Sequence, residues 1–337
     1  MKRLCTTVCL ITALSLFSCV SNPFGSGAET ISPGKPSSIR LAYSGTDEDG
    51  SEIYVTDAFG ILLQRLTDDL HENIAPAWSP DGTKIAYAAD NTICVMNTDG
   101  SDKRDLVEMK LDEKIKWSTD GQWVSFFTDV DPSYLTSLNL ILVRSDGSDV
   151  RIPVQGLSFH DTFDWSPVGN EIVFSRYINS SFDINIITVD GSERTIIQGV
   201  SSPDFSLSPD GNTILFDQGK NLYTIDVIDS TVNQLTFDET RKMNPSWSPD
   251  GSRILYYTYQ SGIYTMNADG TNNRLISGQT IISELSWSPD GLSVSYLAWQ
   301  WNNEELFVIN ADGSDERRLL PGMHVRSYSW CPVTVNH

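Results

Sequence analysis

The sequence predicts an all-β fold, a seven-bladed β-propeller of four-stranded antiparallel blades, from three observations. The pentapeptide Trp-Ser-Pro-Asp-Gly, or a variant of it, recurs along the chain. Its copies stand 39 to 48 residues apart, which is the length of one four-stranded blade. The segments at the two ends of the array are each incomplete, and each supplies what the other lacks. We therefore expect a closed ring.

A large apolar residue opens every repeat and is its most regular feature. The seven anchors are Trp78, Trp117, Trp165, Leu207, Trp247, Trp287 and Trp330. Ser-Pro-Asp-Gly after the anchor is turn chemistry, because Pro suits the second position of a type I turn and Gly accepts a positive φ. The copies at Trp117 and Trp165 lose the Pro or the Asp but keep the anchor. We interpret the pentapeptide as part of the structural frame of the propeller and not as a binding site. The anchor packs between blades, and the turn joins the first strand to the second.

The repeat around Trp247 shows the four expected strands in order, here called A to D. Residues 244–247 lead into the anchor as strand A, and the aliphatic and aromatic run 253–259 is strand B. Strand C covers 262–266, and Asn-Ala-Asp-Gly then forms a hairpin turn into strand D at 274–276. The other repeats fit the same pattern.

The last blade is expected to be composite. Ser327 to Pro332 supplies a strand A and an anchor, and Ile39 to Leu66 supplies three strands with no anchor before them. Pairing the two segments closes the ring, because it removes the exposed sheet edge that each would otherwise leave.

The N-terminus reads as a targeting segment. Lys2 and Arg3 precede an apolar run that is too short to span a bilayer comfortably, and the run ends at Ser18-Cys19. This order resembles a bacterial lipobox, which implies lipidation of Cys19; the alternative is an ordinary signal peptide with a chance Cys. The expected organisation is a lipoprotein signal peptide at 1–18, the lipidated Cys and a Ser/Gly/Pro-rich flexible tether at 19–38, the propeller at 39–332 and a tail at 333–337.

Charge and composition exclude several function classes. The chain has 23 Lys plus Arg against 44 Asp plus Glu, a net charge of -21, which repels nucleic acids and anionic lipids. Membrane contact is therefore expected through the lipid anchor only. Cys94 and Cys331 are expected to be buried thiols. We expect no enzyme activity and no cofactor, since no Gly-x-Ser-x-Gly, phosphate-binding loop or His-Glu-x-x-His occurs.

The best repeats carry a family resemblance. IAPAWSPDGTKIAYAADNTICVMNTDGSDKRDL and PSWSPDGSRILYYTYQSGIYTMNADGTNNRL resemble the TolB-type propeller repeat. The resemblance covers nearly all of Ile39 to Pro332. It implies the propeller fold and, with the N-terminal segment, an extracytoplasmic, membrane-anchored lipoprotein of the periplasm or cell surface.

Loop variation places the expected ligand site. In a propeller the A–B and C–D turns share one rim, and the D–A and B–C connections share the other. The first rim is nearly uniform in this sequence and the second varies, and variable loops on a rigid scaffold usually carry binding residues. The predicted ligand-binding rim, around the central opening, comprises Trp299, Trp301, Tyr134, Tyr177, Phe159, Asp161, Glu284 and Arg326. The alternative for the two tryptophans is packing between blades.

Three of the four histidines, His71, His160 and His324, precede anchors in D–A loops. Imidazoles with nearby carboxylates could hold a divalent metal. Such a site resembles the oligogalacturonate lyases, propellers that hold a metal with histidines near the axis. The alternative is that polar loops contain histidine by chance.

These observations favour a non-catalytic lipoprotein that binds an envelope protein or peptide through the variable rim, with envelope glycan as the second ligand class. The alternative function is a metal-dependent polysaccharide lyase of the oligogalacturonate type. A purely structural subunit of an envelope assembly is the third hypothesis.

Overall fold

The computed structural model divides the chain into two compact units, Met1–Lys35 and Pro36–His337. The structure describes residues 39–47, 50–61, 63–110, 114–129, 138–300 and 303–332, all of which belong to the second unit. The predicted signal peptide, Cys19, the tether and the tail therefore lie outside the described residues. So do Tyr134 and Trp301 of the predicted rim.

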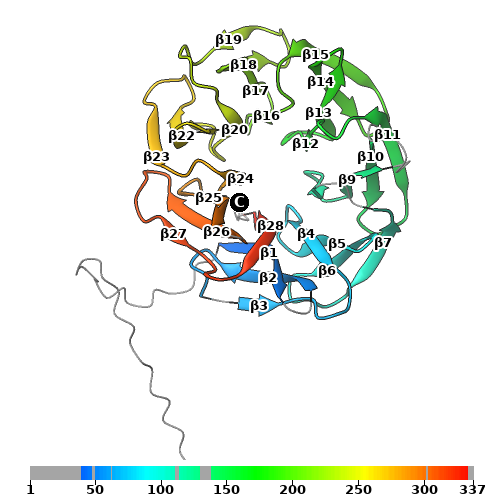
Figure 1. Cartoon of the computed structure of the whole chain (residues 1–337). Coiled ribbons are helices and arrows are strands. Elements are labelled where there is room, and N and C mark those ends of the chain that lie inside the picture. The colour runs from blue at the N-terminus through cyan, green and yellow to red at the C-terminus, as the bar shows by residue number, and fades with distance from the viewer. Residues whose placement is uncertain are drawn as a thin grey trace, which may run out of the picture. The chain divides into compact units, whose positions relative to one another are not determined.

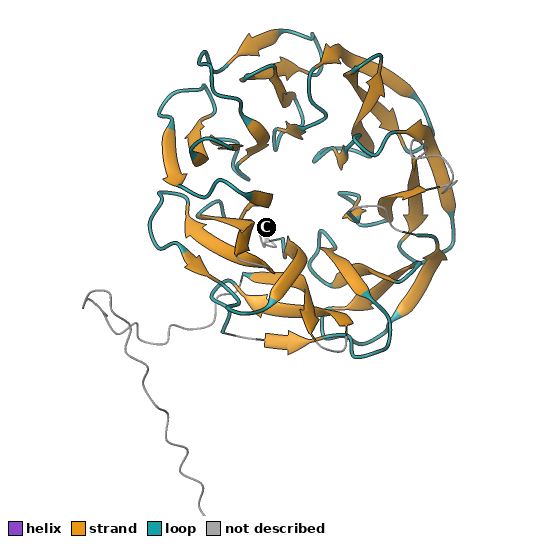
Figure 2. Ribbon diagram, in the orientation of Figure 1, coloured by secondary structure: helices purple, strands orange, loops and turns teal. Residues whose placement is uncertain are grey.

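The second unit is a ring of seven four-stranded antiparallel sheets, each with its first strand at the centre (Figures 1 and 2). Blades one to three are β4 (Asn73–Trp78), β5 (Lys84–Ala89), β6 (Thr92–Asn97), β7 (Arg104–Glu108); β8 (Lys116–Trp117), β9 (Trp123–Asp129), β10 (Leu138–Arg144), β11 (Val150–Leu157); and β12 (Phe163–Trp165), β13 (Glu171–Ile178), β14 (Ser181–Thr188), β15 (Glu193–Val200). Blades four to six are β16 (Phe205–Leu207), β17 (Thr213–Gln218), β18 (Asn221–Asp226), β19 (Val232–Gln234); β20 (Met243–Trp247), β21 (Arg253–Thr258), β22 (Gly262–Asn267), β23 (Arg274–Ser277); and β24 (Ile282–Trp287), β25 (Ser293–Gln300), β26 (Asn303–Asn310), β27 (Arg317–Arg318). Blade seven is β28 (His324–Trp330), β1 (Arg40–Asp47), β2 (Gly50–Asp57), β3 (Leu63–Arg65).

The predicted fold class is confirmed, including the strands expected around Trp247, whose ends agree within one residue. All elements among the described residues are strands. No helix in this part of the chain is long and apolar enough to cross a membrane.

The core lies between blades. Strands B and C are buried along most of their length, as in β5 and β6, whereas outer strands such as β3 are exposed. Seven clusters of buried apolar residues result, one at each blade junction of the described ring. Each sheet is thus stabilised by burial against both neighbours.

The anchors sit at these junctions, as predicted. The Trp117 indole N–H donates to Ala77 O at 2.9 Å, and the Trp165 indole donates to Ser125 Oγ at 2.8 Å, each in the preceding blade. The Ser-Pro-Asp-Gly turns are self-contained. In the first copy, Ser79 Oγ donates to Asp81 Oδ1 at 2.6 Å and accepts the Lys84 N–H at 2.9 Å. The pentapeptide therefore has a structural role in the propeller.

Blade seven closes the ring as predicted. Strand β28 pairs antiparallel with β1, with Leu41 opposite Trp330 and Tyr43 opposite Tyr328. The Cys331 N–H extends the pairing to Arg40 O at 2.8 Å. The segments at the two ends of the array therefore form one sheet (Figure 1).

Candidate functional site

On the A–B and C–D rim, aspartate side chains accept hydrogen bonds from residues of their own turns. Asp99, in one C–D turn, accepts the Ser101 N–H at 2.9 Å and the Ser101 hydroxyl at 2.6 Å. These bonds from Ser101 hold the pKa of Asp99 below its ordinary value. Asp146 with Ser148 and Asp312 with Ser314 repeat this arrangement. The carboxylates of these three turns thus have local partners.

On the opposite rim, the structure brings together the predicted residues of blade three. Phe159 and His160 lie between β11 and β12, and Tyr177 lies near the end of β13. The ring centroids of Phe159 and His160 are 3.9 Å apart, and those of His160 and Tyr177 are 6.2 Å apart. Tyr177 continues the stack to Phe182, which is buried. The outer face of this stack is exposed because Phe159 and Tyr177 are each about half accessible.

Asp161 supports this loop from within. Its Oδ2 accepts the Ser158 N–H at 2.7 Å, and its own N–H donates back to Ser158 O at 2.9 Å. Burial raises the pKa of Asp161 to about 6, although backbone N–H groups oppose the rise. Its position indicates that it shapes the loop that carries Phe159 and His160.

Exposed aromatic side chains gather on the B–C and D–A rim. Among the described residues, the exposed aromatics of this rim are Phe159, Tyr177, Phe237, Tyr259 and Trp299, against Phe59 alone on the other rim. Trp299 belongs to β25, as expected if it packed between blades. However, the residue is 51% exposed. Sequence reasoning missed Phe237 and Tyr259. Their place in a D–A and a B–C connection was the available signal.

Blades seven and one form a polar sector of the same rim. His71 Nδ1 lies 2.7 Å from Asp90 Oδ2, and this hydrogen bond raises the pKa of His71. Arg326, a predicted rim residue on β28, pairs with Glu72 Oε2 at 2.8 Å. The rim thus has an aromatic arc over blades three to six and a polar sector across the closure.

The three predicted metal ligands have separate surroundings. His71 pairs with Asp90, and His160 stacks between aromatic rings. His324 is the first residue of β28, not a loop residue as expected, and its Nδ1 accepts the Glu304 N–H at 3.3 Å. Within the described ranges, no three His, Cys, Asp or Glu side chains are grouped to hold a metal ion. The metal site therefore stays a prediction, which elemental analysis of the purified chain tests.

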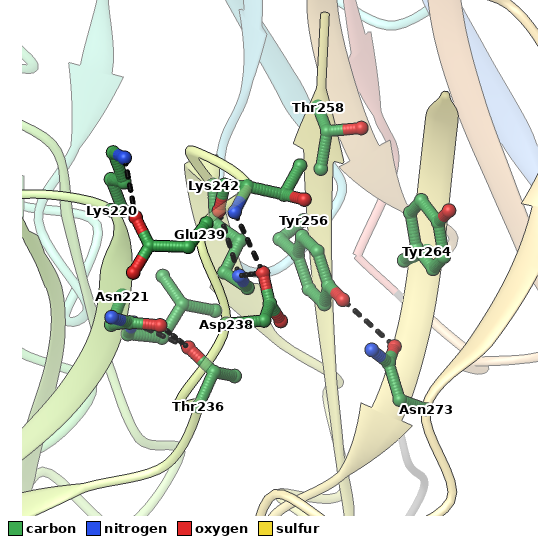
Figure 3. Close-up of polar contacts among 12 residues, drawn as sticks. Lys220, Asn221, Thr236, Asp238, Glu239, Lys242, Tyr256, Thr258, Tyr264 and Asn273 are labelled. Atoms are coloured by element: carbon green, nitrogen blue, oxygen red, sulfur yellow. Dashed lines mark hydrogen bonds and ion pairs between the residues drawn. The ribbon is translucent and has the colours of Figure 1, made fainter. Parts of the chain in front are cut away.

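Two D–A loops share a polar brace that the sequence analysis did not identify. Lys242 is buried, and its Nζ donates to Asp238 Oδ1 at 2.6 Å and to Thr240 O at 2.8 Å (Figure 3). Asn73 repeats the pattern one half-ring away. Its Nδ2 donates to Asp69 Oδ1 at 2.8 Å, four residues earlier, and to the carbonyl two residues earlier at 3.1 Å. Both loops begin with a Thr whose hydroxyl accepts a strand C backbone N–H. The signal was the shared spacing Thr-x-Asp-x-x-x-Asn/Lys-x-x-Pro-x-Trp.

Glu284, the remaining predicted rim residue, faces the central opening. It lines a pocket of about 430 Å³ that also takes in Lys114 and Lys116 from blade two, Asp164 from blade three and Tyr328 from blade seven. The pocket lies among innermost strands, so it is axial. Its lining includes two lysines, one aspartate and one glutamate, whose charges can recognise a charged ligand.

Known proteins share this architecture. The A. baumannii TolB crystal structure aligns with a TM-score of 0.55 and 17% identity, over 88% of this chain and 67% of that one. An oligogalacturonate lyase in complex with manganese aligns with a TM-score of 0.65 and 13% identity, over 80% and 85%. The Pyrococcus horikoshii acylaminoacyl peptidase gives 0.61 and 18%, over 83% of this chain and half of the peptidase. At these identities the likeness is one of fold.

The family assignment comes from the sequence itself. Residues 161–334, which include the anchors from Trp165 to Trp330, match the PD40 family, described as the TolB beta propeller domain. The match covers more than half of the chain, and the seven closed blades agree with it. The chain belongs to the TolB β-propeller domain family.

Proposed function

We propose that this propeller is a non-catalytic binding module that holds a protein or peptide on its B–C and D–A rim. The observation that carries the proposal is the unequal distribution of exposed aromatic side chains between the two rims. Large aromatic residues are enriched at protein interfaces, because they bury much apolar area and lose little conformational entropy on binding. The aromatic arc over blades three to six supplies such side chains, on loops that are braced by their own hydrogen bonds.

A capture experiment with matched variants tests the binding role. The purified full chain is immobilised and exposed to a native envelope extract, and bound proteins are identified by mass spectrometry. We expect a partner that is retained by the natural chain and by Phe59→Ala, which removes the one aromatic side chain that is exposed on the described part of the other rim. Tyr259→Ala and Trp299→Ala should each weaken its retention. Equal retention by all variants, or capture of envelope glycan in place of protein, contradicts the proposal.

We further propose that the chain acts outside the cytoplasm, anchored by lipid on Cys19. Lys2 and Arg3, the apolar run and Cys19 stand in the order that lipidation requires. Expression in a bacterial host followed by fractionation tests this proposal. The natural chain should partition with membranes and lose residues 1–18, whereas Cys19→Ser should appear in the soluble extracytoplasmic fraction. Membrane retention of the Cys19→Ser protein contradicts lipid anchoring.

A further inference from the structure

The axial pocket contains an ion pair between blades that are not neighbours. Lys114 precedes β8 in blade two, Glu284 lies on β24 in blade six, and their Nζ and Oε1 atoms are 2.9 Å apart. Blades seven and one stand between them in the ring. The lysine therefore reaches across the central opening to a carboxylate on the far side.

The two partners differ in exposure, and the difference decides which kind of ligand can replace one of them. The Lys114 side chain is 61% exposed, whereas that of Glu284 is 14% exposed. A cationic ligand at Glu284 releases Lys114 into water, where an ammonium is well solvated. An anionic ligand at Lys114 would instead leave a mostly buried carboxylate without a counter-charge, which is costly. Exchange should therefore cost less free energy for a cationic ligand than for an anionic one.

The surroundings of Glu284 leave that position to an exchangeable cation. Tyr328 lines the same pocket, but its hydroxyl hydrogen is used in a bond to Ser295 O at 3.0 Å. Burial raises the pKa of Tyr328, and the nearby Glu284 charge adds to the rise, so the phenol stays neutral. Lys114 is the cation shown at Glu284 among the residues that the structure describes.

The charge of Lys114 also acts on a second carboxyl group, that of Asp204. Burial raises the pKa of Asp204, before β16, while Arg241 and Lys114 act in the opposite direction. Lys114 therefore already lies within electrostatic reach of a second carboxylate.

We propose that the axial pocket recognises a cationic side chain, an arginine or lysine of the bound peptide, whose charged group takes the place of Lys114 at Glu284. The inference rests on the proposed binding function and specifies its ligand chemistry. The net charge of -21 attracts such a group and repels an acidic one. The pocket of about 430 Å³ lies within the usual size of ligand sites. Arginine is the better fit, because its planar guanidinium can donate two hydrogen bonds to one carboxylate.

The probe is a blocked tripeptide, acetyl-Gly-Arg-Gly-amide, titrated into the full chain by calorimetry at low salt. Acetyl-Gly-Glu-Gly-amide, with the opposite charge, is the comparison. The arginine peptide should bind, and Glu284→Gln should weaken it by about tenfold or more, since the charge-assisted bond is lost. Lys114→Met should tighten it several-fold, because the internal competitor is gone. A merely structural role for Lys114 predicts no such gain.

Asp149→Asn is the control, because it removes an exposed carboxylate on the other rim, which pairs with Arg151 outside the pocket. It should leave the affinity unchanged, and thermal midpoints show that each variant is folded. No binding of the arginine peptide at millimolar concentration overturns the inference. So does preferential binding of the glutamate peptide that Lys114→Met abolishes. In either case, partner capture that depends on Tyr259 and Trp299 would leave the proposed function standing and remove only its axial chemistry.

Discussion

Asp217, on β17 in blade four, has a fully buried carboxyl group. Its titration should make the free energy of unfolding depend on pH. Burial raises its pKa from the ordinary value of 3.8 to about 7, and the Asp204 carboxylate adds to the rise against Ser202 and Arg241. Between these two pH values the folded protein keeps a proton that the unfolded chain has lost. The stabilisation by this group is complete below pH 3.8 and is lost as the pH rises through 7.

The perturbation is Asp217→Asn, which keeps the shape of the side chain and removes its titration. The whole pKa change corresponds to about 4 kcal/mol of unfolding free energy, of which about 2 kcal/mol falls above pH 5.5. Any cost of burying the amide is the same at every pH. The Asn variant should therefore gain about 2 kcal/mol on the natural chain when the pH goes from 5.5 to 8.5.

Urea unfolding of both proteins at the two pH values measures this gain. The control is Asp146→Asn at an exposed C–D turn, where the bonds from Ser148 hold the pKa below its ordinary value. Asp146 is therefore ionised in both states at both pH values, and its variant should show no pH-dependent difference. A stability difference for Asp217→Asn that stays constant with pH would refute the assignment of a protonated carboxyl to the folded state.

Two further predictions concern the frame. Trp165→Phe should lower the free energy of unfolding by about 1–2 kcal/mol more than Trp78→Phe, as measured by urea unfolding. The reason is that the first indole donates a buried bond of 2.8 Å, whereas the second has no acceptor among the described residues; equal losses contradict this reasoning. Gly262→Ala should cost about 2 kcal/mol or more beyond Gly191→Ala in the same assay. Both have positive φ, but a Cβ on Gly262 would lie 2.1 Å from the Ser277 carbonyl and one on Gly191 would meet nothing, so similar losses would show that the contact relaxes freely.

The fold could be predicted because each blade repeats the same local information. The anchors, the Ser-Pro-Asp-Gly turns and the alternating strands recur, and Leu207 keeps the pattern although it lacks an indole. The closure of the ring could be predicted by counting strands. The strand that ends at Trp330 and the three strands after Ile39 together make one four-stranded blade. Repetition thus made even a contact between the ends of the array predictable.

The site could be predicted only as a rim. In the letters Tyr-Tyr-Thr-Tyr of blade five, Tyr256 and Tyr257 are buried and Tyr259 is exposed, and only the position where β21 ends separates them. The pair of Lys114 and Glu284 depends on the width of the ring, which no local pattern encodes. The brace on Lys242 could not be predicted either. In the sequence a buried lysine looks like an ordinary surface residue, and only the structure shows the two acceptors that surround it.

The composite blade has a consequence for how the ring is made. The hydroxyls of Ser44 and Ser327 are 2.8 Å apart although 283 positions separate them in sequence. Strand β1 is the first of the described strands to be synthesised and its partner β28 is the last of them, so one edge of β1 stays unpaired until the other described strands have been made. An open edge of this kind recruits strands from other molecules. Contacts of such high sequence separation also form slowly. Truncation before His324, which removes β28, should therefore give aggregates rather than a stable ring, because one edge of β1 is left open.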